Sequence, residues 1–191
     1  MLLERNNGFE VKPMSTNDIS IYSSITWEVA RQKNFVSADG CVDIVGLIEN
    51  GGILDTDVGC GLSIVDDKAL PNAYAMTFAD GSIQVRESVY NAACDGDARS
   101  RFTLAHELGH VLMHKKQIGM ARAINASTKL YCDSEWQANE FAGRLLLPDD
   151  ELKKVIGKQE PYEIAKTYGV SYECASIRID KFKKKTRMLR Q

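Results

Sequence analysis

The sequence predicts a mixed α+β fold whose helices are concentrated in the second half of the chain. The apolar-rich runs AYAMTF and SIQVRE flank Asp80-Gly81, a dipeptide that favours a hairpin near 74–86, and we expect this hairpin to belong to a small antiparallel sheet. The later stretches have apolar residues at helical spacing, separated by glycine and proline. The 191 residues suit one compact domain, since this length can bury a substantial core.

The first part of the chain is expected to be the least regular. Residues 1–25 are polar and weakly patterned, and they read as loosely structured. A short helix is expected over 25–32, and a second over 42–49, where Gly51-Gly52 supplies a stop signal. We therefore expect a polar N-terminal segment, 1–36, before a core that spans 37–157.

A longer helix is expected from near Asp97 or Ser100 to about Lys116. It follows a turn at 95–97. Residues 117–132 lack clear periodicity and read as a loop.

Another helix is expected to begin at Ser134, because Ser134 and Gln137 have the spacing of a capping box. Pro148 should close it after Leu147. Further helices are expected after Asp149, over 161–168 and after Ser171, with Gly169 as the break between the last two. Residues 158–191 would then form a C-terminal helical segment.

Net charge, hydropathy and cysteine usage argue against several classes of protein. The net charge of -2 gives no general case for nucleic-acid binding, and no apolar run is long enough to cross a membrane. The start MLLERNNGFE lacks the pattern of a signal peptide. The cysteines are odd in number and scattered, which argues against a disulfide framework or a cysteine zinc site: Cys41, Cys60, Cys94, Cys132 and Cys174. We therefore expect a cytoplasmic protein with no membrane partner.

All three histidines lie within the run RFTLAHELGHVLMH. His106 and His110 are four residues apart, so on a helix they share one face at roughly 5–6 Å between Cβ atoms. Both imidazoles can therefore reach one ion, while Glu107 leaves at an angle suited to a water beside that ion. Histidines on an apolar helix are often satisfied core residues, but a buried pair needs partners and a metal is the simplest one.

His114 is a poor third ligand, because it lies about 12 Å along the helix axis from His106. We expect it to pack or to line the cleft. The third ligand should be a carboxylate on the helix SEWQANEFAGRLLLP.

Two glutamates on that helix compete. Glu135 shares a face with small and apolar residues and is preferred. Glu140 is four residues before Arg144, a spacing more typical of a solvated ion pair than of a ligand. Asn139 is placed to accept a hydrogen bond from a ligand imidazole, although an ordinary packing amide is an equal alternative.

These residues predict hydrolytic chemistry with one Zn²⁺ per chain, or Mn²⁺ in its place. Two imidazoles and one carboxylate leave a coordination position for water, whose pKa zinc lowers to about 7. Glu107 would be the general base and would return the proton to the leaving amine. Candidates for an additional transition-state donor are Tyr131, His114 and Arg101.

The segments RFTLAHELGHVLMH (101–114) and EWQANEFAGRLLLP (135–148) together resemble the ImmA/IrrE family of metallo-endopeptidases. VDIVGLIENGGI (42–53) and GSIQVRES (81–88) resemble it more weakly. The resemblance implies a zincin-like, gluzincin-type peptidase core with His106, His110 and Glu135 as ligands. It also implies cleavage of a helix-turn-helix repressor, which relieves repression in mobile genetic elements or during a stress response.

The segment 164–182 has the spacing of a helix-turn-helix, and a basic tail begins within its last residues and continues beyond them: Arg178, Lys181, Lys183, Lys184, Lys185, Arg187 and Arg190. It could dock DNA, but helices packed on the peptidase core are favoured, and repressor docking is a third use. The alternative function is a non-proteolytic, antitoxin-like or DNA-binding regulator with a structural zinc. The open coordination position argues against it.

Overall fold

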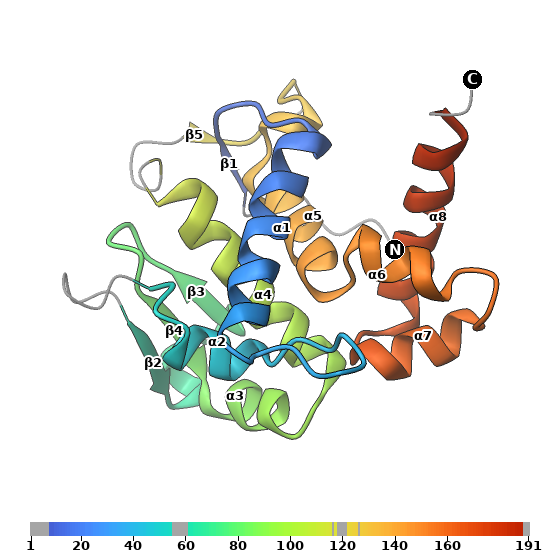
Figure 1. The fold of residues 1–191 in the computed structure, drawn as a ribbon. Helices are drawn as coiled ribbons and strands as arrows, with labels where there is room; N and C mark the ends of the chain where they lie inside the picture. The colour runs from blue at the N-terminus through green and yellow to red at the C-terminus, as the bar shows by residue number, and fades with distance from the viewer. Residues whose placement is uncertain (1–7, 55–60, 116, 118–121, 126, 189–191) are drawn as a thin grey trace.

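Two helices, α4 (Ala98–His114) and α5 (Ser134–Leu146), form the centre of the fold and pack directly against each other. The computed structural model describes residues 8–54, 61–115, 117, 122–125 and 127–188. In Figure 1, α1 lies along this pair, and the sheet with its short helices lies on one side. The C-terminal helices α6 to α8 lie on the other side.

The close approach of α4 and α5 depends on Gly109, within the histidine motif. A Cβ there would lie 2.9 Å from the Phe141 ring and 3.4 Å from the Ala138 Cα. The glycine therefore allows α5 to pass close to the histidines.

Asp97 caps α4 by accepting a hydrogen bond of 2.8 Å from the Ser100 amide, as the predicted start of this helix requires.

The small sheet contains β2 (Leu62–Val65), β3 (Ala75–Thr77) and β4 (Ile83–Arg86), in the order β2-β4-β3. The predicted hairpin is confirmed, since β3 pairs antiparallel with β4 and Gly81 has a φ of 89°. The expectation that all strands of this sheet are antiparallel is wrong, because β2 pairs parallel with β4. Parallel pairing has no local turn signal, so its partner strand was not recognised.

The N-terminal part is more regular than expected. Helix α1 spans Thr16–Gln32 and begins with a capping box between Ser15 and Asp18, so the loosely structured reading is wrong from residue 16 onward. Its buried face includes Ser23 and Thr26, which explains the weak apolar pattern. Helix α2 (Ile44–Asn50) matches its prediction closely, whereas α3 (Glu87–Cys94) was not predicted.

The predicted loop 117–132 contains two short elements, β5 (Arg122–Ala123) and the 3₁₀ helix η3 (Leu130–Cys132). Strand β5 pairs with β1 (Phe9–Glu10). The predicted cap of α5 is also wrong by one residue: Asp133 accepts the capping hydrogen bond, from the Glu135 amide. Ser134 is buried instead, and its hydroxyl accepts a hydrogen bond from the Phe9 amide.

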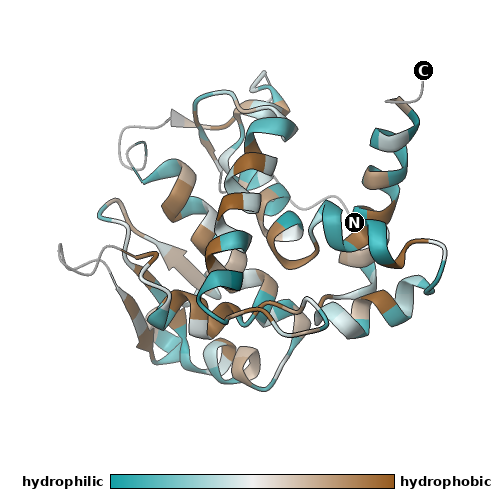
Figure 2. Cartoon of the chain, in the orientation of Figure 1, coloured by the Kyte–Doolittle hydropathy of each residue, from teal (hydrophilic) through white to brown (hydrophobic). Residues whose placement is uncertain are grey.

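The C-terminal helices follow the predicted order: α6 (Asp149–Val155), α7 (Pro161–Tyr168) and α8 (Tyr172–Met188). Gly169 ends α7 with a φ of 60°, and the Ser171 hydroxyl accepts a hydrogen bond from the Cys174 amide. Figure 2 shows hydrophilic residues over much of α6. No helix in the described ranges is long and apolar enough to cross a bilayer. The boundaries expected near residues 36 and 157 stay predictions.

The cysteines form no disulfide bond within the described part of the chain. Cys41, Cys94, Cys132 and Cys174 carry free thiols. Cys60 lies outside the described residues.

Candidate metal centre

Three predicted ligands converge where α5 crosses α4. The Nε2 atoms of His106 and His110 lie 2.9 Å apart, and each lies 3.2 Å from one carboxylate oxygen of Glu135. The side chain of His110 is 7% exposed, that of His106 14% and that of Glu135 36%. The trio therefore has a buried side, toward His110, and a side that solvent reaches.

The donor set fits a divalent metal ion. Zinc bonds of 2.0–2.2 Å in a tetrahedral site separate neighbouring ligand atoms by roughly 3.3 Å, and the distances between these ligand atoms are close to that value. Lone pairs at such distances repel one another unless a proton or a cation lies between them. His106, His110 and Glu135 thus form a group that could hold a metal.

The charges of the trio are mutually dependent. Burial lowers the pKa of His106, but the hydrogen bond with Glu135 and the charges of Glu107 and Glu135 outweigh it, so this pKa is raised. Burial alone would raise the pKa of Glu135, yet its hydrogen bonds with the two histidines bring that pKa well below the ordinary value. The carboxylate is therefore ionised at neutral pH, as a metal ligand must be.

The competing carboxylate, Glu140, lies elsewhere. It accepts hydrogen bonds from Arg144 at 2.7 Å and from Lys181 on α8. The expected pairing with Arg144 is present, but the expectation that it is solvated is wrong, since Glu140 is only 4% exposed. Its contact with α8 could not be seen from helical spacing.

Asn139 occupies the place predicted for it beside a ligand. Its Oδ1 lies 3.0 Å from His106 Nδ1. The amide oxygen can only accept, so His106 carries its proton on Nδ1 in the neutral form. The Nε2 lone pair then points at the centre of the trio.

The predicted general base, Glu107, is held by a residue that sequence reasoning missed. The Thr77 hydroxyl on β3 donates to Glu107 Oε2 at 2.7 Å and lies 3.1 Å from the Glu107 carbonyl oxygen. Within AYAMTF a threonine reads simply as a β-branched strand residue. No local signal could have identified this contact.

Of the two roles expected for His114, packing is the one observed, because the side chain is fully buried and cannot line a cleft. Its Nδ1 lies 3.0 Å from His110 Nδ1, and its Nε2 lies 2.8 Å from the Gln137 Oε1. Burial and the nearby charge of His110 lower the pKa of His114 to about 4. A fully buried ring behind a ligand cannot reach a substrate as a transition-state donor.

Of the other two candidate donors, Arg101 is also excluded. It is 9% exposed, and its guanidinium donates to the carbonyls of Gly169 and Val42, where it ties α4 to two distant segments. Tyr131 on η3 is 42% exposed and stays available as a candidate.

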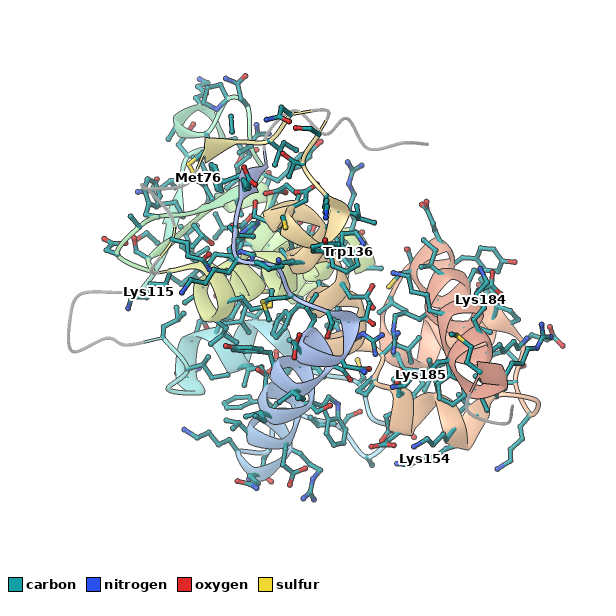
Figure 3. All side chains as sticks on the ribbon, turned by 90° about the horizontal axis from the view of Figure 1, so that it is seen from above. Met76, Lys115, Trp136, Lys154, Lys184 and Lys185 are labelled. Carbon is teal, nitrogen blue, oxygen red and sulfur yellow. The ribbon has the colours of Figure 1, made fainter. Side chains whose placement is uncertain are left out.

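Part of the basic tail forms ion pairs with acidic residues of the same protein. Arg178 and Lys185 pair with Asp149, and Lys181 pairs with Glu140. The remaining described cations are exposed and make no ion pair within the described ranges: Lys183, Lys184 and Arg187. Arg190 lies outside the described residues. In Figure 3, Lys184 and Lys185 lie on α8, far across the view from Met76 on β3.

Comparison with known proteins gives a match over the part of the chain that carries the site. The model of the M78 peptidase family, described as the IrrE N-terminal-like domain, matches residues 69–180 and so includes every site residue named above. Metallopeptidase ImmA of Bacillus subtilis (strain 168) is 38% identical over 56 residues, which are 29% of this chain and 32% of that protein. The chain thus matches about a third of this relative's length. With more than half of its residues matched by the family model, the chain belongs to the IrrE N-terminal-like, or M78 peptidase, family.

Proposed function

We propose that this protein is a zinc-dependent endopeptidase that cleaves a helix-turn-helix transcriptional repressor at one site and so relieves repression. The observation that carries the proposal is the convergence of His106, His110 and Glu135 beside Glu107. Three ligands with one solvent-reachable side are typical of catalytic rather than structural zinc sites.

The residues of the site have separate roles in metal binding and in the orientation of a ligand. His106, His110 and Glu135 would hold the ion, and Asn139 keeps the His106 ring oriented by its 3.0 Å hydrogen bond. A zinc ion bound there would supply the Lewis acidity that polarises a peptide carbonyl and acidifies water.

Glu107 performs the proton transfers in this proposal. Its carboxylate accepts a proton from the attacking water and then delivers it to the nitrogen of the leaving amine. Thr77 restricts the carboxylate through Oε2, which leaves Oε1 as the oxygen for this exchange. The hydrogen bond prevents the glutamate from turning away between the two transfers.

Support for the substrate class comes from relatedness. The chain resembles a family whose members cut helix-turn-helix repressors, and the relative from Bacillus subtilis carries the name metallopeptidase. DNA docking by α7 and α8 is less favoured, because Arg178, Lys181 and Lys185 already pair with acidic residues of this protein.

The test uses purified protein loaded with Zn²⁺ and a candidate helix-turn-helix repressor from the same genome. We expect about one zinc per chain and two discrete repressor fragments. Glu107→Gln should abolish cleavage and retain zinc, whereas the same change at the exposed Glu173 should leave cleavage intact.

An intact repressor after incubation with zinc-loaded protein would contradict the proposed substrate. Sequence-specific DNA binding that survives Glu107→Gln, together with no cleavage of the repressor, would favour the non-proteolytic alternative. A gel-shift assay at physiological salt distinguishes the two outcomes.

A further inference from the structure

Two buried polar side chains behind the metal ligands take no part in the proton transfers above. His114 and Gln137 are both fully buried. The Gln137 Oε1 lies 2.8 Å from His114 Nε2, and His114 Nδ1 lies 3.0 Å from His110 Nδ1. The buried side of the trio is thus connected to a continuous line of polar atoms.

The direction of each hydrogen bond along this line follows from its far end. The Gln137 side-chain nitrogen donates to two backbone carbonyls, Lys12 at 2.9 Å and Tyr131 at 2.8 Å. Carbonyl oxygens only accept, so the amide cannot be turned around and its Oε1 must face His114. His114 Nε2 must therefore carry a proton in order to donate to that oxygen.

The remaining proton positions then follow. In neutral His114 the proton on Nε2 leaves Nδ1 as an acceptor. His110 must therefore carry its proton on Nδ1, and its Nε2 presents a lone pair toward Glu135 and His106. A His114 protonated on Nδ1 would force the opposite arrangement and place a proton on His110 Nε2.

We propose that His114 and Gln137 form a positioning relay that sets the tautomer of His110, so that its Nε2 is ready to bind metal. The inference rests on the proposed metal site but concerns different residues. Asn139 does the same for His106 directly, while His110 depends on two side chains in series.

The relay also connects the metal site to the N-terminal segment, because Gln137 donates to the Lys12 carbonyl. The segment around β1 is held against α5 and η3 by hydrogen bonds from the amides of Phe9, Val11 and Met14. A Cβ on Gly8 would lie 3.2 Å from the Glu135 Cγ, so this segment also passes beside the carboxylate ligand. It lies outside the residues matched by the family model, so its contribution is additional to the matched domain.

One experiment compares two substitutions of His114 in the full-length protein. Asparagine places Oδ1 where the imidazole Nδ1 was and can still accept from His110, whereas leucine fills more of the space but accepts nothing. Zn²⁺ affinity is measured by competition with a chelator. We expect His114→Leu to lose about 10–100-fold in affinity, as for other partners of metal-ligating histidines, and His114→Asn to lose far less.

The comparison separates positioning from packing. Asparagine removes more of the ring volume than leucine does, so an effect of packing alone would make His114→Asn the weaker binder. A lower zinc affinity in His114→Asn than in His114→Leu would overturn the proposal. An unchanged affinity in folded His114→Leu would overturn it as well. Leu152→Ala serves as a control for general destabilisation, because Leu152 is a buried residue of α6, which carries no site residue.

A second measurement needs no variant. Long-range ¹H–¹⁵N correlations of the wild-type protein at neutral pH report the tautomer of each histidine. We expect His114 protonated on Nε2 alone and His110 on Nδ1. His114 protonated on Nδ1 would overturn the relay. Because the Gln137 contacts define the His114 tautomer without zinc, this result is independent of whether the protein cleaves a repressor.

Discussion

The hydroxyl of Thr77 on β3 donates a 2.7 Å hydrogen bond to the carboxylate of Glu107 on α4. The two residues are thirty positions apart, and the antiparallel pairing of β3 with β4 places the threonine beside the helix. The sheet therefore does more than cover the apolar side of α4. It supplies the group that orients the proposed general base.

Replacing Thr77 should impair catalysis more than metal binding. We expect Thr77→Val to lower kcat by about tenfold or more, a typical loss for a partner of an active-site group, because the carboxylate gains freedom to turn. Zn²⁺ affinity should stay within about twofold of wild type. Thr77→Ser retains the hydroxyl and should recover most of the rate. Equal activity of all three proteins in a repressor-cleavage assay would show that the contact has no positioning role.

Replacement of each of the two competing glutamates should affect a different property, metal binding for Glu135 and stability for Glu140. Glu135→Ala should lose the metal, since only His106 and His110 of the trio remain. Glu140→Ala should keep the metal but lower the free energy of unfolding by about 3 kcal/mol. This is the low end for a broken buried ion pair, because Arg144 still contacts Asp149.

The measurements for this pair are zinc content after dialysis and urea unfolding. Metal loss in Glu140→Ala with retention in Glu135→Ala would reverse the ligand assignment.

A methyl group at Gly109 should disturb the crossing of the central helices. In Gly109→Ala the new Cβ would lie 2.9 Å from the Phe141 ring, and such overpacking costs about 1–3 kcal/mol. The displaced α5 carries Glu135, so zinc affinity should fall together with stability. Gly143→Ala on α5 meets only the Arg178 side chain, at 3.2 Å, and no atom of α4, so it should leave zinc affinity unchanged. Unaltered affinity in Gly109→Ala would mean that the crossing tolerates the methyl group.

The ion cluster under α8 should give the protein an acid-sensitive component of stability. Burial raises the pKa of Asp149, but its hydrogen bonds with Arg178 and Lys185 outweigh burial and lower that pKa from 3.8 to about 2. A lowered folded-state pKa means that ionised Asp149 stabilises the folded state. This stabilisation is complete above the unfolded pKa of 3.8 and is lost as the pH falls through about 2.

Urea unfolding of wild type and Asp149→Asn across this range provides the measurement. The difference in unfolding free energy should be largest near neutral pH and should shrink as the pH approaches 2. A difference that grows with acidification would contradict the assigned direction of the pKa shift.

The sequence by itself determined the features that depend on local geometry. The helical repeat places His106 and His110 on one face with Glu107 beside them, whatever the rest of the chain does. Asp80-Gly81 specified the hairpin, and Asp97 and Gly169 marked helix ends, because turn and capping preferences act over a few residues. The choice of Glu135 over Glu140 also followed from which face of one helix each residue occupies.

The tertiary structure alone decided everything that depends on how distant segments meet. The parallel β2 strand, the Thr77 contact, the burial of Glu140 beneath α8 and the line from His110 through Gln137 to Lys12 each join residues remote in sequence. Such contacts are set by the crossing of α4 and α5 and by the side chains that fill the space around it. Helical and strand periodicity specify only which face of an element is apolar, and they do not identify the partner that will cover it.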